Sequence, residues 1–406
     1  MRLFVVSSIL AFLASCDSPP SKPSSSLRTM ADSLARQFII VDGHVDLPYR
    51  LRVNNFKLER EYLGIPIETD KGDFDFVRAV EGGLDAPFMS IYIPSSYQKD
   101  GGAKALADSL IDMIEGIAAA HPDKFAIATS PRQIKKNHRK GIVSLPLGME
   151  NGAGIEDDIR NLKHFYDRGI RYITLTHATD NLICDSSYDS TQTWDGLSSF
   201  GEQVVREMNR IGIMVDISHV SDQAFFDVMS ITDVPVIASH SSARRYTPDF
   251  ERNMSDEMIE RLGRNNGVIM INFGTNFLDG SIRAQKDSLR ILLNKELKQA
   301  GLGATDEGAE AIIEDFRSRH PTLYADVETV ADHIDHVVNL VGIDHVGLGS
   351  DFDGVGDSLP TGLKDVSDYP NLIFTLLRRG YGKEDIEKIC SGNVMRVWRA
   401  VQAAAD

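Results

Sequence analysis

The residues able to do chemistry in this chain are seven histidines and carboxylates that each follow a short apolar run. They are His44, Asp46, Glu150, His177, His219, His240 and Asp351. His44 and Asp46 follow Phe38–Val41 and lie two residues apart, so in an extended chain their side chains point to the same side. Any one of these residues alone is more often a solvated or hydrogen-bonded group. The recurrence of the pattern at successive apolar runs favours a shared site.

A shared site of this composition predicts bound metal. Four imidazoles and three carboxylates are costly to bury together unless a cation balances them. One catalytic zinc needs only three protein ligands and an open position, so the set is larger than one ion requires. A carboxylate such as Glu150 can bridge two ions about 3.5–4 Å apart, and water held there has its pKa lowered toward roughly 7. His177 is not needed as a ligand, which suits the binding of a carbonyl oxygen.

The other histidines lie in charged or helical contexts and are interpreted as structural. They are His121, His138, His164, His320, His333, His336 and His345. The two cysteines beyond residue 16, Cys184 and Cys390, lack the spacing of a metal-binding knuckle, and the sequence does not tell whether they pair. Any metal is therefore expected to use histidine and carboxylate ligands.

Short apolar runs alternate with helical segments along the chain, which predicts βα units and a parallel sheet. The predicted strands are Phe38–Val41, Phe88–Tyr92, Ile142–Leu147, Tyr172–Thr176, Ile213–Ile217, Val236–Ala238, Val268–Asn272 and Val346–Gly349. The predicted helices between them include Ala103–Ala120, Ile155–Arg168, Phe200–Arg210, Asp222–Ser230, Ser255–Arg264 and Val327–Val341. Ser221 and Ser255 precede two of these helices and are expected N-caps.

Eight strands with intervening helices favour a distorted (β/α)₈ TIM-type barrel, an α/β fold. A doubly wound open sheet is the alternative, but it would gather polar residues near one switch point rather than along the whole chain. Residues Phe273–Tyr324 are interpreted as an insertion with surface helices. The segments Val366–Arg379, Lys383–Ile389 and Asn393–Ala405 are expected to form a helical C-terminal cover. Residues 31–406 are therefore predicted to be a single metallohydrolase domain.

Composition narrows the classes of partner. The chain of 406 residues carries a formal charge of −16 and contains no basic run, which argues against nucleic-acid binding. Leu3–Ala14 is apolar but too short to span a bilayer, and residues 1–16 are expected to be a signal peptide ending in a lipobox, Leu13-Ala14-Ser15-Cys16. Cys16 would then carry the lipid, and residues 17–30 would form a Pro/Ser-rich flexible tether. An ordinary secretory signal with a chance cysteine is the alternative. The expected location is the bacterial cell envelope, on the periplasmic or outer face.

Eight segments together resemble the membrane (renal) dipeptidase family of zinc peptidases, here in the form of a bacterial lipoprotein. They are VDGHVDLP (Val41–Pro48), GMENG (Gly148–Gly152), LTHATDN (Leu175–Asn181), DISHVS (Asp216–Ser221), SHSSAR (Ser239–Arg244), ERNMSD (Glu251–Asp256), GLGSDFDG (Gly347–Gly354) and GNVMRVW (Gly392–Trp398). They follow the family's order from about Asp42 to Trp398, so the resemblance covers most of the chain.

The resemblance implies an amidohydrolase-type barrel, a homodimer, two zinc ions and a dipeptide substrate that includes D-residue dipeptides among the candidates. By position, His44 and Asp46 would hold one zinc, His219 and His240 the other, and Glu150 would bridge them. Asp351 would orient the bridging hydroxide and pass its proton to the leaving amine. His177 would bind the carbonyl oxygen. Arg252, in a loop past His240, would bind the terminal carboxylate of the dipeptide, a planar anion that suits its forked guanidinium.

Some positions depart from the family pattern. Val45 stands where an asparagine is expected, and Asn151 stands where a glycine is expected after Glu150. Ala178 and Thr179 stand where mammalian members have a cysteine, so the disulfide of those members is not expected here. None of these positions is an expected metal ligand, so they bear on how the substrate fits rather than on the metal centre.

Two other functions remain compatible with the residues. The same barrel could open lactone or β-lactam bonds, in which case Arg252 would contribute little. The chain could also be an inactive surface lipoprotein that binds a ligand or partner, but a degraded set of ligands would be expected then, and every expected ligand is present.

Overall fold

A computed structural model describes residues 24–53 and 67–405. Its centre is a closed barrel of parallel strands in the order β1-β10-β9-β8-β7-β6-β5-β2. These strands are β1 (Ile40–Val45), β2 (Leu84–Tyr92), β5 (Leu147–Glu150), β6 (Ile170–Thr174), β7 (Met214–Asp216), β8 (Ile237–Ala238), β9 (Val268–Ile271) and β10 (Val346–Leu348). Almost all of their residues are buried, as expected for parallel strands covered on both faces. The predicted barrel is confirmed, and the open sheet is excluded.

The third predicted strand, Ile142–Leu147, is wrong as a single element. β4 (Val143–Leu145) pairs with β3 (Phe125–Ile127) in a separate two-stranded sheet, and only β5 belongs to the barrel. Pro146 separates the two, because proline has no N–H to donate to a continuous ladder. Glu150 is therefore the last residue of its barrel strand.

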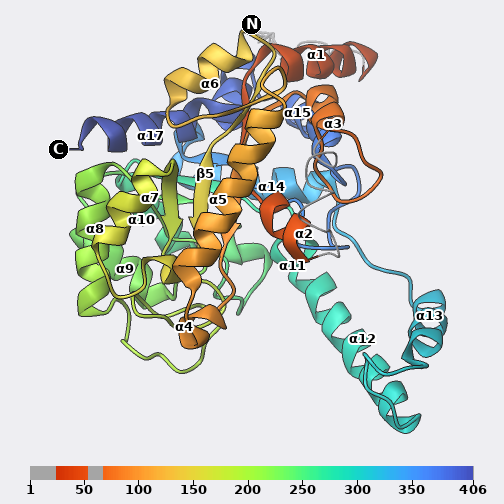
Figure 1. The fold of residues 1–406 in the computed structure, drawn as a ribbon. Helices are drawn as coiled ribbons and strands as arrows, with labels where there is room; N and C mark the ends of the chain where they lie inside the picture. The colour runs from red at the N-terminus through yellow and green to blue at the C-terminus, as the bar shows by residue number, and fades with distance from the viewer. Residues whose placement is uncertain (1–23, 54–66, 406) are drawn as a thin grey trace, which may run out of the picture.

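Helices surround the barrel (Figure 1). They are α2 (Leu47–Val53), α3 (Phe76–Gly82), α4 (Tyr97–Asp100), α5 (Ala103–Ala120), α6 (Pro131–His138), α7 (Arg160–Asp167), α8 (Ser199–Ile211), α9 (Asp222–Ile231), α10 (Asp256–Arg264) and α14 (Val327–Val341), with short turns η1 (Gly152–Ile155), η2 (Arg244–Tyr246) and η3 (Ile343–His345). The predicted caps are confirmed: Ser221 accepts a hydrogen bond from the Ala224 N–H, and Ser255 accepts one from the Met258 N–H. The helix predicted from Ile155 begins only at Arg160, because Glu156 has a left-handed φ of 55° that a helix cannot contain.

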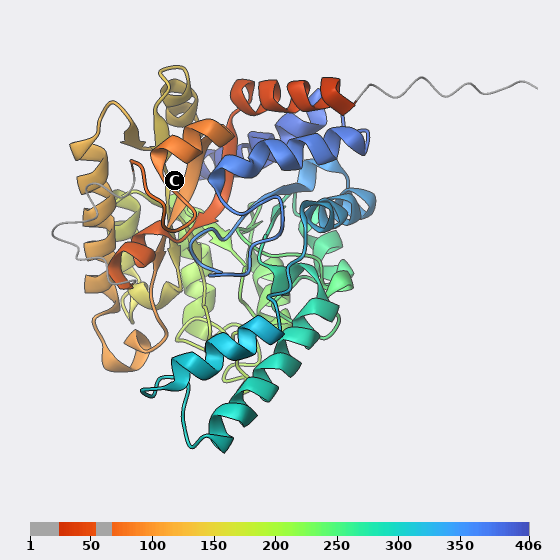
Figure 2. The same ribbon diagram turned by 90° about the vertical axis from the view of Figure 1, so that its right-hand side faces the viewer.

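The predicted insertion forms a helical arm. It contains α11 (Thr275–Leu278), α12 (Gly280–Gln299) and α13 (Ala309–Arg319), and the last two extend away from the barrel (Figures 1 and 2). Leu297 of α12 and Phe316 of α13 are buried, whereas Ile291 on α12 is 66% exposed. The arm therefore buries a small apolar seam of its own and adds little to the barrel core.

The predicted C-terminal cover is confirmed. It consists of η4 (Val366–Asp368), α15 (Tyr369–Arg378), α16 (Lys383–Glu387), the π-helical turn η5 (Lys388–Gly392) and α17 (Asn393–Ala403). Trp398 of α17 is fully buried, and its ring centroid lies 5.2 Å from that of Phe88 on β2. The cover thus packs directly on a barrel strand.

The tether predicted for residues 17–30 is wrong at its C-terminal end, because α1 (Ser24–Gln37) begins at Ser24. Ala31, Leu34 and Ala35 are buried against the core, and α1 lies beside α15 (Figure 2), where the Arg28 guanidinium donates to Asn371 at 2.6 Å. Burial of this apolar face outweighs the flexible composition of residues 24–26. The predicted signal peptide and Cys16 lie outside the described residues. Within those residues, no helix has both the length and the apolar character needed to cross a membrane.

Candidate metal centre and active site

The seven predicted residues converge at the carboxyl ends of the barrel strands. The ligand atoms of three overlapping groups each lie within 4.8 Å of one another: His44–Glu150–His240, Glu150–His177–His219 and His44–Asp46–Asp351. A cavity of about 580 Å³ opens onto them. It is lined by Asp46, Tyr49, Tyr92, Glu150, His177, Ala178, Tyr188, His219, Asn276, Phe277, Asp351, Asp353, Gly354, Val355 and Ser358. The prediction that strand ends bring these groups together is confirmed, although His44 and His240 are buried behind Glu150 and do not line the cavity themselves.

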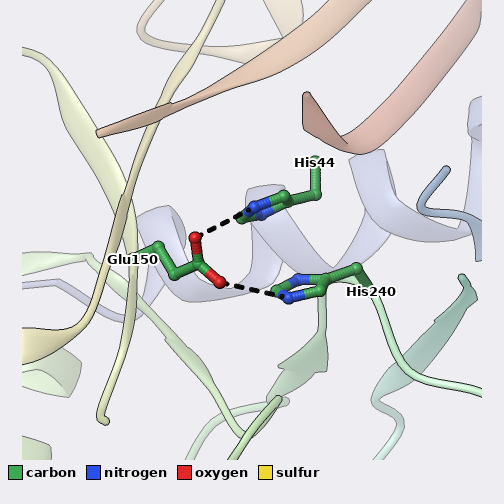
Figure 3. Close-up of side chains that lie close together, drawn as sticks. All are labelled: His44, Glu150 and His240. Carbon is green, nitrogen blue, oxygen red and sulfur yellow. Dashed lines mark ion pairs between the residues drawn. The ribbon is translucent and has the colours of Figure 1, made fainter. Parts of the chain in front are cut away.

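Glu150 lies between two pairs of metal-binding side chains, and its two oxygens face His44 and His240 in Figure 3. Its Oε2 lies 3.3 Å from Nε2 of His44, which is 3.5 Å from Oδ2 of Asp46. Its Oε1 lies 3.1 Å from Nε2 of His219 and 3.4 Å from Nε2 of His240. The two oxygens of one carboxylate therefore face two different pairs of ligands.

The His44 ring is held in the tautomer that binds metal through Nε2. The Tyr172 hydroxyl donates to the Gly43 carbonyl at 3.0 Å, so it must accept the hydrogen bond from His44 Nδ1 at 2.9 Å. In the neutral ring, the proton on Nδ1 leaves the lone pair of Nε2 directed toward Glu150, where a cation could take the place of a second ring proton. This is the usual arrangement behind a metal-bound histidine.

The His240 ring is held in the same way. The Ser239 hydroxyl donates to Oδ2 of the buried Asp216 at 2.6 Å, and accepts from His240 Nδ1 at 2.7 Å. The Thr174 hydroxyl also donates to Asp216 Oδ2, at 2.5 Å. His240 therefore presents the lone pair of Nε2 to the cavity side.

Two imidazole nitrogens of the cluster face each other. Nε2 of His219 and Nε2 of His240 lie 2.9 Å apart. Burial lowers the pKa of both rings well below the usual value, and nearby positive groups, Arg252 among them, lower it further. The Nε2 lone pair of a neutral His240 can be satisfied either by a proton on His219 Nε2 or by a bound cation.

The remaining electrostatics also favour positive charge at this point. Burial lowers the pKa of His44, but the Tyr172 hydroxyl, Glu150 and Asp46 outweigh it and raise the pKa well above the usual value. Burial raises the pKa of Glu150, and the surrounding imidazoles reverse this to well below its ordinary value. Among the described residues, no hydrogen-bond partner satisfies His44 Nε2, Asp46 Oδ1 or His219 Nδ1, although all three atoms are buried. The imidazole nitrogens and carboxylate oxygens gathered here are the ligand atoms preferred by divalent cations that take nitrogen and oxygen ligands.

Asp351 follows β10 and enters the cavity beside Asp46. The Asn272 side-chain amide donates to its Oδ2 at 2.8 Å, and its backbone N–H donates to the His44 carbonyl at 3.1 Å. Burial raises the pKa of this carboxyl to about 7, with His44 opposing the rise and Asp46 adding to it. A cation nearby would lower the pKa again.

His177 lies beside the cluster and lines the cavity. Its Nε2 is 3.6 Å from Glu150 Oε1, and its Nδ1 is 3.4 Å from the Tyr92 hydroxyl. Burial lowers the pKa of His177 despite the nearby Glu150. A neutral imidazole in this place can donate an N–H to a substrate oxygen.

Arg252 occupies a different place from the one its predicted role suggests. Its side chain is buried and does not line the cavity. Its terminal nitrogens donate to the Ser241 hydroxyl at 2.7 Å and to the His240 carbonyl at 2.8 Å, and its guanidinium lies 5.3 Å from the ring centroid of Phe277, which does line the cavity. Arg252 therefore lies behind Phe277 and the other residues that line the cavity.

Sequence reasoning missed the groups that orient the ligands: Tyr172, Asp216, Ser239, Asn272 and Asp42. Asp216 and Ser239 stand next to ligands in DISH and SH, which is a usable signal. Asp42 accepts the N–H groups of His44 at 2.9 Å and Ser350 at 3.0 Å and the Tyr369 hydroxyl, which fixes the end of β1 to that of β10. Tyr172 reads as an ordinary strand residue, and no local signal marks it.

Comparison with known proteins agrees with this site. The family model for membrane dipeptidase (peptidase family M19) matches residues 28–406. Dipeptidase tcpJ of Claviceps purpurea is 34% identical over 372 residues, which are 90% of this chain and 77% of the relative. Dipeptidase 3 of Rattus norvegicus is 32% identical over 384 residues, which are 94% of this chain and 68% of the relative.

Solved structures show the same fold. The probable dipeptidase PvdM from Pseudomonas aeruginosa has a TM-score of 0.78 at 25% identity, covering 94% of this chain and 100% of that chain. A metallopeptidase from Rhodobacter sphaeroides, solved with a phosphinate mimic of the dipeptide L-Ala-D-Ala, has a TM-score of 0.72 at 25% identity, covering 90% and 99%. The chain belongs to the membrane dipeptidase family, peptidase family M19, and is a metallo-dipeptidase.

Proposed function

We propose that this enzyme is a binuclear zinc dipeptidase that hydrolyses short dipeptides, including those with a D-residue. The observation that carries the proposal is the position of Glu150, whose two oxygens face His44 with Asp46 on one side and His219 with His240 on the other. A single carboxylate placed between two ligand pairs is suited to bridge two ions. When bound, the ions would lower the pKa of water and polarise the scissile carbonyl.

Asp351 is placed to move the proton. It lies within the ligand group of His44 and Asp46 and is oriented by the Asn272 amide. Ionised beside cations, its carboxylate accepts a proton from the attacking water and returns it to the leaving amine. The Asn272 hydrogen bond leaves one Asp351 oxygen for this transfer.

His177 is placed to bind the carbonyl oxygen as negative charge develops on it. The Tyr92 hydroxyl lies 3.4 Å from Nδ1, which leaves Nε2 toward the cluster, and the lowered pKa keeps the ring neutral. A preorganised donor of this kind stabilises the transition state more than the ground state.

The size of the cavity and one relative support the substrate class. A volume of about 580 Å³ accommodates a dipeptide with free termini and is within the range of small-molecule sites. The Rhodobacter sphaeroides metallopeptidase was solved with a mimic of L-Ala-D-Ala, and we extend D-residue substrates to this chain by that similarity. Turnover of matched L-Ala-D-Ala and L-Ala-L-Ala by the zinc-loaded protein tests this extension.

The position of Arg252 keeps a second function in view. Because its terminal nitrogens already contact Ser241 and His240, a substrate without a carboxylate loses little there. Opening of a lactone or β-lactam bond by the same cluster is therefore the alternative.

The Glu150→Gln variant tests the binuclear centre. The amide cannot bridge two cations, so we expect two zinc ions per chain in the wild type, one or fewer in the variant, and activity lowered by more than about a hundredfold. Zinc content by elemental analysis and release of free amino acids measure these effects. Glu115→Gln, on the exposed face of α5, is the control. Full zinc content in Glu150→Gln would contradict the bridging role.

The Tyr172→Phe variant tests the orientation of His44. It removes the acceptor for His44 Nδ1 but keeps the ring that packs against Phe88 with centroids 5.1 Å apart. We expect zinc affinity, measured by chelator competition, to fall about ten- to a hundredfold. The control is Tyr381→Phe on the C-terminal cover, which loses a hydroxyl bonded to Asp335 at 2.6 Å. Equal zinc affinity in the two variants would refute this role of Tyr172.

Arg252→Met distinguishes the dipeptidase from the alternative. If the guanidinium binds the terminal carboxylate, wild-type kcat/KM should be about ten- to a hundredfold higher for a dipeptide than for its C-terminal amide. This factor corresponds to the free energy of one charge-assisted hydrogen bond. That preference should disappear in Arg252→Met. Lactone cleavage that survives in the variant while dipeptide cleavage is lost would favour the alternative function.

We also propose that lipid on Cys16 anchors the enzyme to the cell envelope, and that the enzyme is a homodimer. The support for the anchor is the lipobox Leu13-Ala14-Ser15-Cys16, and the support for the dimer is the family resemblance. Labelling with a palmitate analogue should mark the wild type and not Cys16→Ser. An unlabelled wild type would leave the ordinary secretory signal as the better account. The molar mass in solution tests the dimer.

A further inference from the structure

A second charged cluster, formed by Arg50, Asp73 and Asp353, lies beside the carboxylates of the site, and Asp353 also lines the cavity. The side chains of Arg50 and Asp353 are 3% and 0% exposed, and Arg50 Nε lies 3.3 Å from Asp353 Oδ2. A buried ion pair adds little stability over apolar side chains of similar size. Such a pair more often fixes the relative position of the segments that carry it, and the contacts of this cluster show which segments those are.

Asp73 and Asp353 bridge two loops by reciprocal hydrogen bonds. The Asp73 N–H donates to Asp353 Oδ1 at 2.6 Å, and the Asp353 N–H donates to Asp73 Oδ2 at 2.7 Å. Asp351 and Asp353 have left-handed φ angles of 63° and 67°, which are unfavourable for residues with a Cβ. The loop after β10 therefore needs contacts from elsewhere to keep this conformation.

Arg50 connects the same loop to the metal ligand Asp46. It lies in the first turn of α2, where its N–H donates to the Asp46 carbonyl at 3.0 Å. Its terminal nitrogens donate to the carbonyls of Lys71 at 2.7 Å and Phe74 at 3.2 Å. Gly72, at a φ of 66°, makes room for this guanidinium, because a Cβ there would lie 1.2 Å from Nη1.

The loop of residues 351–354, which this cluster holds in place, contains Asp351 and contacts Asp46. The Asp46 N–H donates to the Phe352 carbonyl at 2.8 Å. Gly354 packs so closely that a Cβ on it would lie 2.2 Å from Asp351 Oδ1 and 2.2 Å from Asp46 Oδ2. Any movement of residues 352–354 would therefore move Asp351 relative to Asp46.

We propose that Arg50, Asp73 and Asp353 form a positioning cluster that fixes Asp351 relative to the metal ligand Asp46. Asp353 belongs to the loop of residues 351–354 and lines the cavity, and Arg50 and Asp73 act on that loop, so the role assigned to all three is positioning and not catalysis. The consequence for turnover rests on the proposed dipeptidase function. The consequence for metal binding does not, because Asp46 and Asp351 belong to one potential ligand group.

Asp353→Asn tests the cluster, since it keeps an oxygen for the Asp73 N–H but removes the charge opposite Arg50. At saturating zinc we expect kcat to fall about tenfold or more with KM unchanged within twofold, because asparagine has the shape of aspartate and keeps the cavity wall that Asp353 helps to line. We also expect one of the two zinc dissociation constants to rise about tenfold, and the other to stay unchanged. Asp73→Asn, which is milder, should move the same quantities in the same direction.

Asp365→Asn is the matched control. It breaks the ion pair of Asp365 with Arg78, which measures 3.0 Å, and Asp365 does not line the cavity. This variant should lose thermal stability and keep kcat and both zinc dissociation constants. Wild-type kcat and zinc affinity in Asp353→Asn, with only a stability loss like that of the control, would overturn the proposal.

A double variant adds an internal check. Arg50→Gln combined with Asp353→Asn should lower kcat no more than the stronger single variant, because both changes disrupt one cluster. Losses that multiply would show that the two residues act separately and would contradict the proposal. A wild-type enzyme with no dipeptidase activity would refute the proposed function, and zinc binding by the same variants would still decide the positioning role.

Discussion

The burial of carboxylates at one point of the barrel is the constraint on which the rest of this site depends. Asp46 and Asp351 lie in one group of potential ligands with His44, and Glu150 lies 3.3 Å from the same histidine. Burial is the largest of the effects that raise the pKa of Asp351 to about 7. The ionised form of such a group is stable only beside positive charge. The hydrogen bonds to Tyr172 and Ser239 place a proton on Nδ1 of His44 and of His240, so the neutral rings direct their Nε2 lone pairs to this point. The site therefore has negative charge that the protein's own side chains do not fully balance.

The same hydrogen bonds tie the barrel together. Tyr172 of β6 reaches across the barrel to His44 of β1, and it has room because its register partner on β5 is Gly148, where a Cβ would lie 2.0 Å from the tyrosine Cζ. Asp216 of β7 joins Thr174 at the end of β6 to Ser239 after β8. Ligand orientation and strand packing are thus one set of contacts, and a change in either alters the other.

The barrel and the convergence of the seven histidines and carboxylates could be predicted because strand periodicity and strand-end chemistry are local properties of the sequence. The predicted boundaries of two elements were wrong because a single residue determines each of them. Pro146 divides one predicted strand into two, and the left-handed Glu156 moves the start of α7 to Arg160. The start of α1 failed because packing against α15 outweighs local composition. Tyr172 and Arg50 could not be found, because their roles arise from register and long-range contacts. The lining of the cavity by Phe277 in front of Arg252 is likewise a tertiary property.

Because of the helical arm, substitutions that alter the cavity entrance fall on a different segment from substitutions that alter the metal ligands. The candidate metal ligands lie at the carboxyl ends of barrel strands or just beyond them, whereas Asn276 and Phe277 in the cavity wall belong to α11, at the base of the arm. Substitutions or length changes in residues 273–324 can therefore reshape the entrance without moving a ligand. In a lineage, substrate range can drift while the reaction is conserved. The arm is accordingly the segment to exchange between relatives when a different substrate range is wanted from the same metal centre.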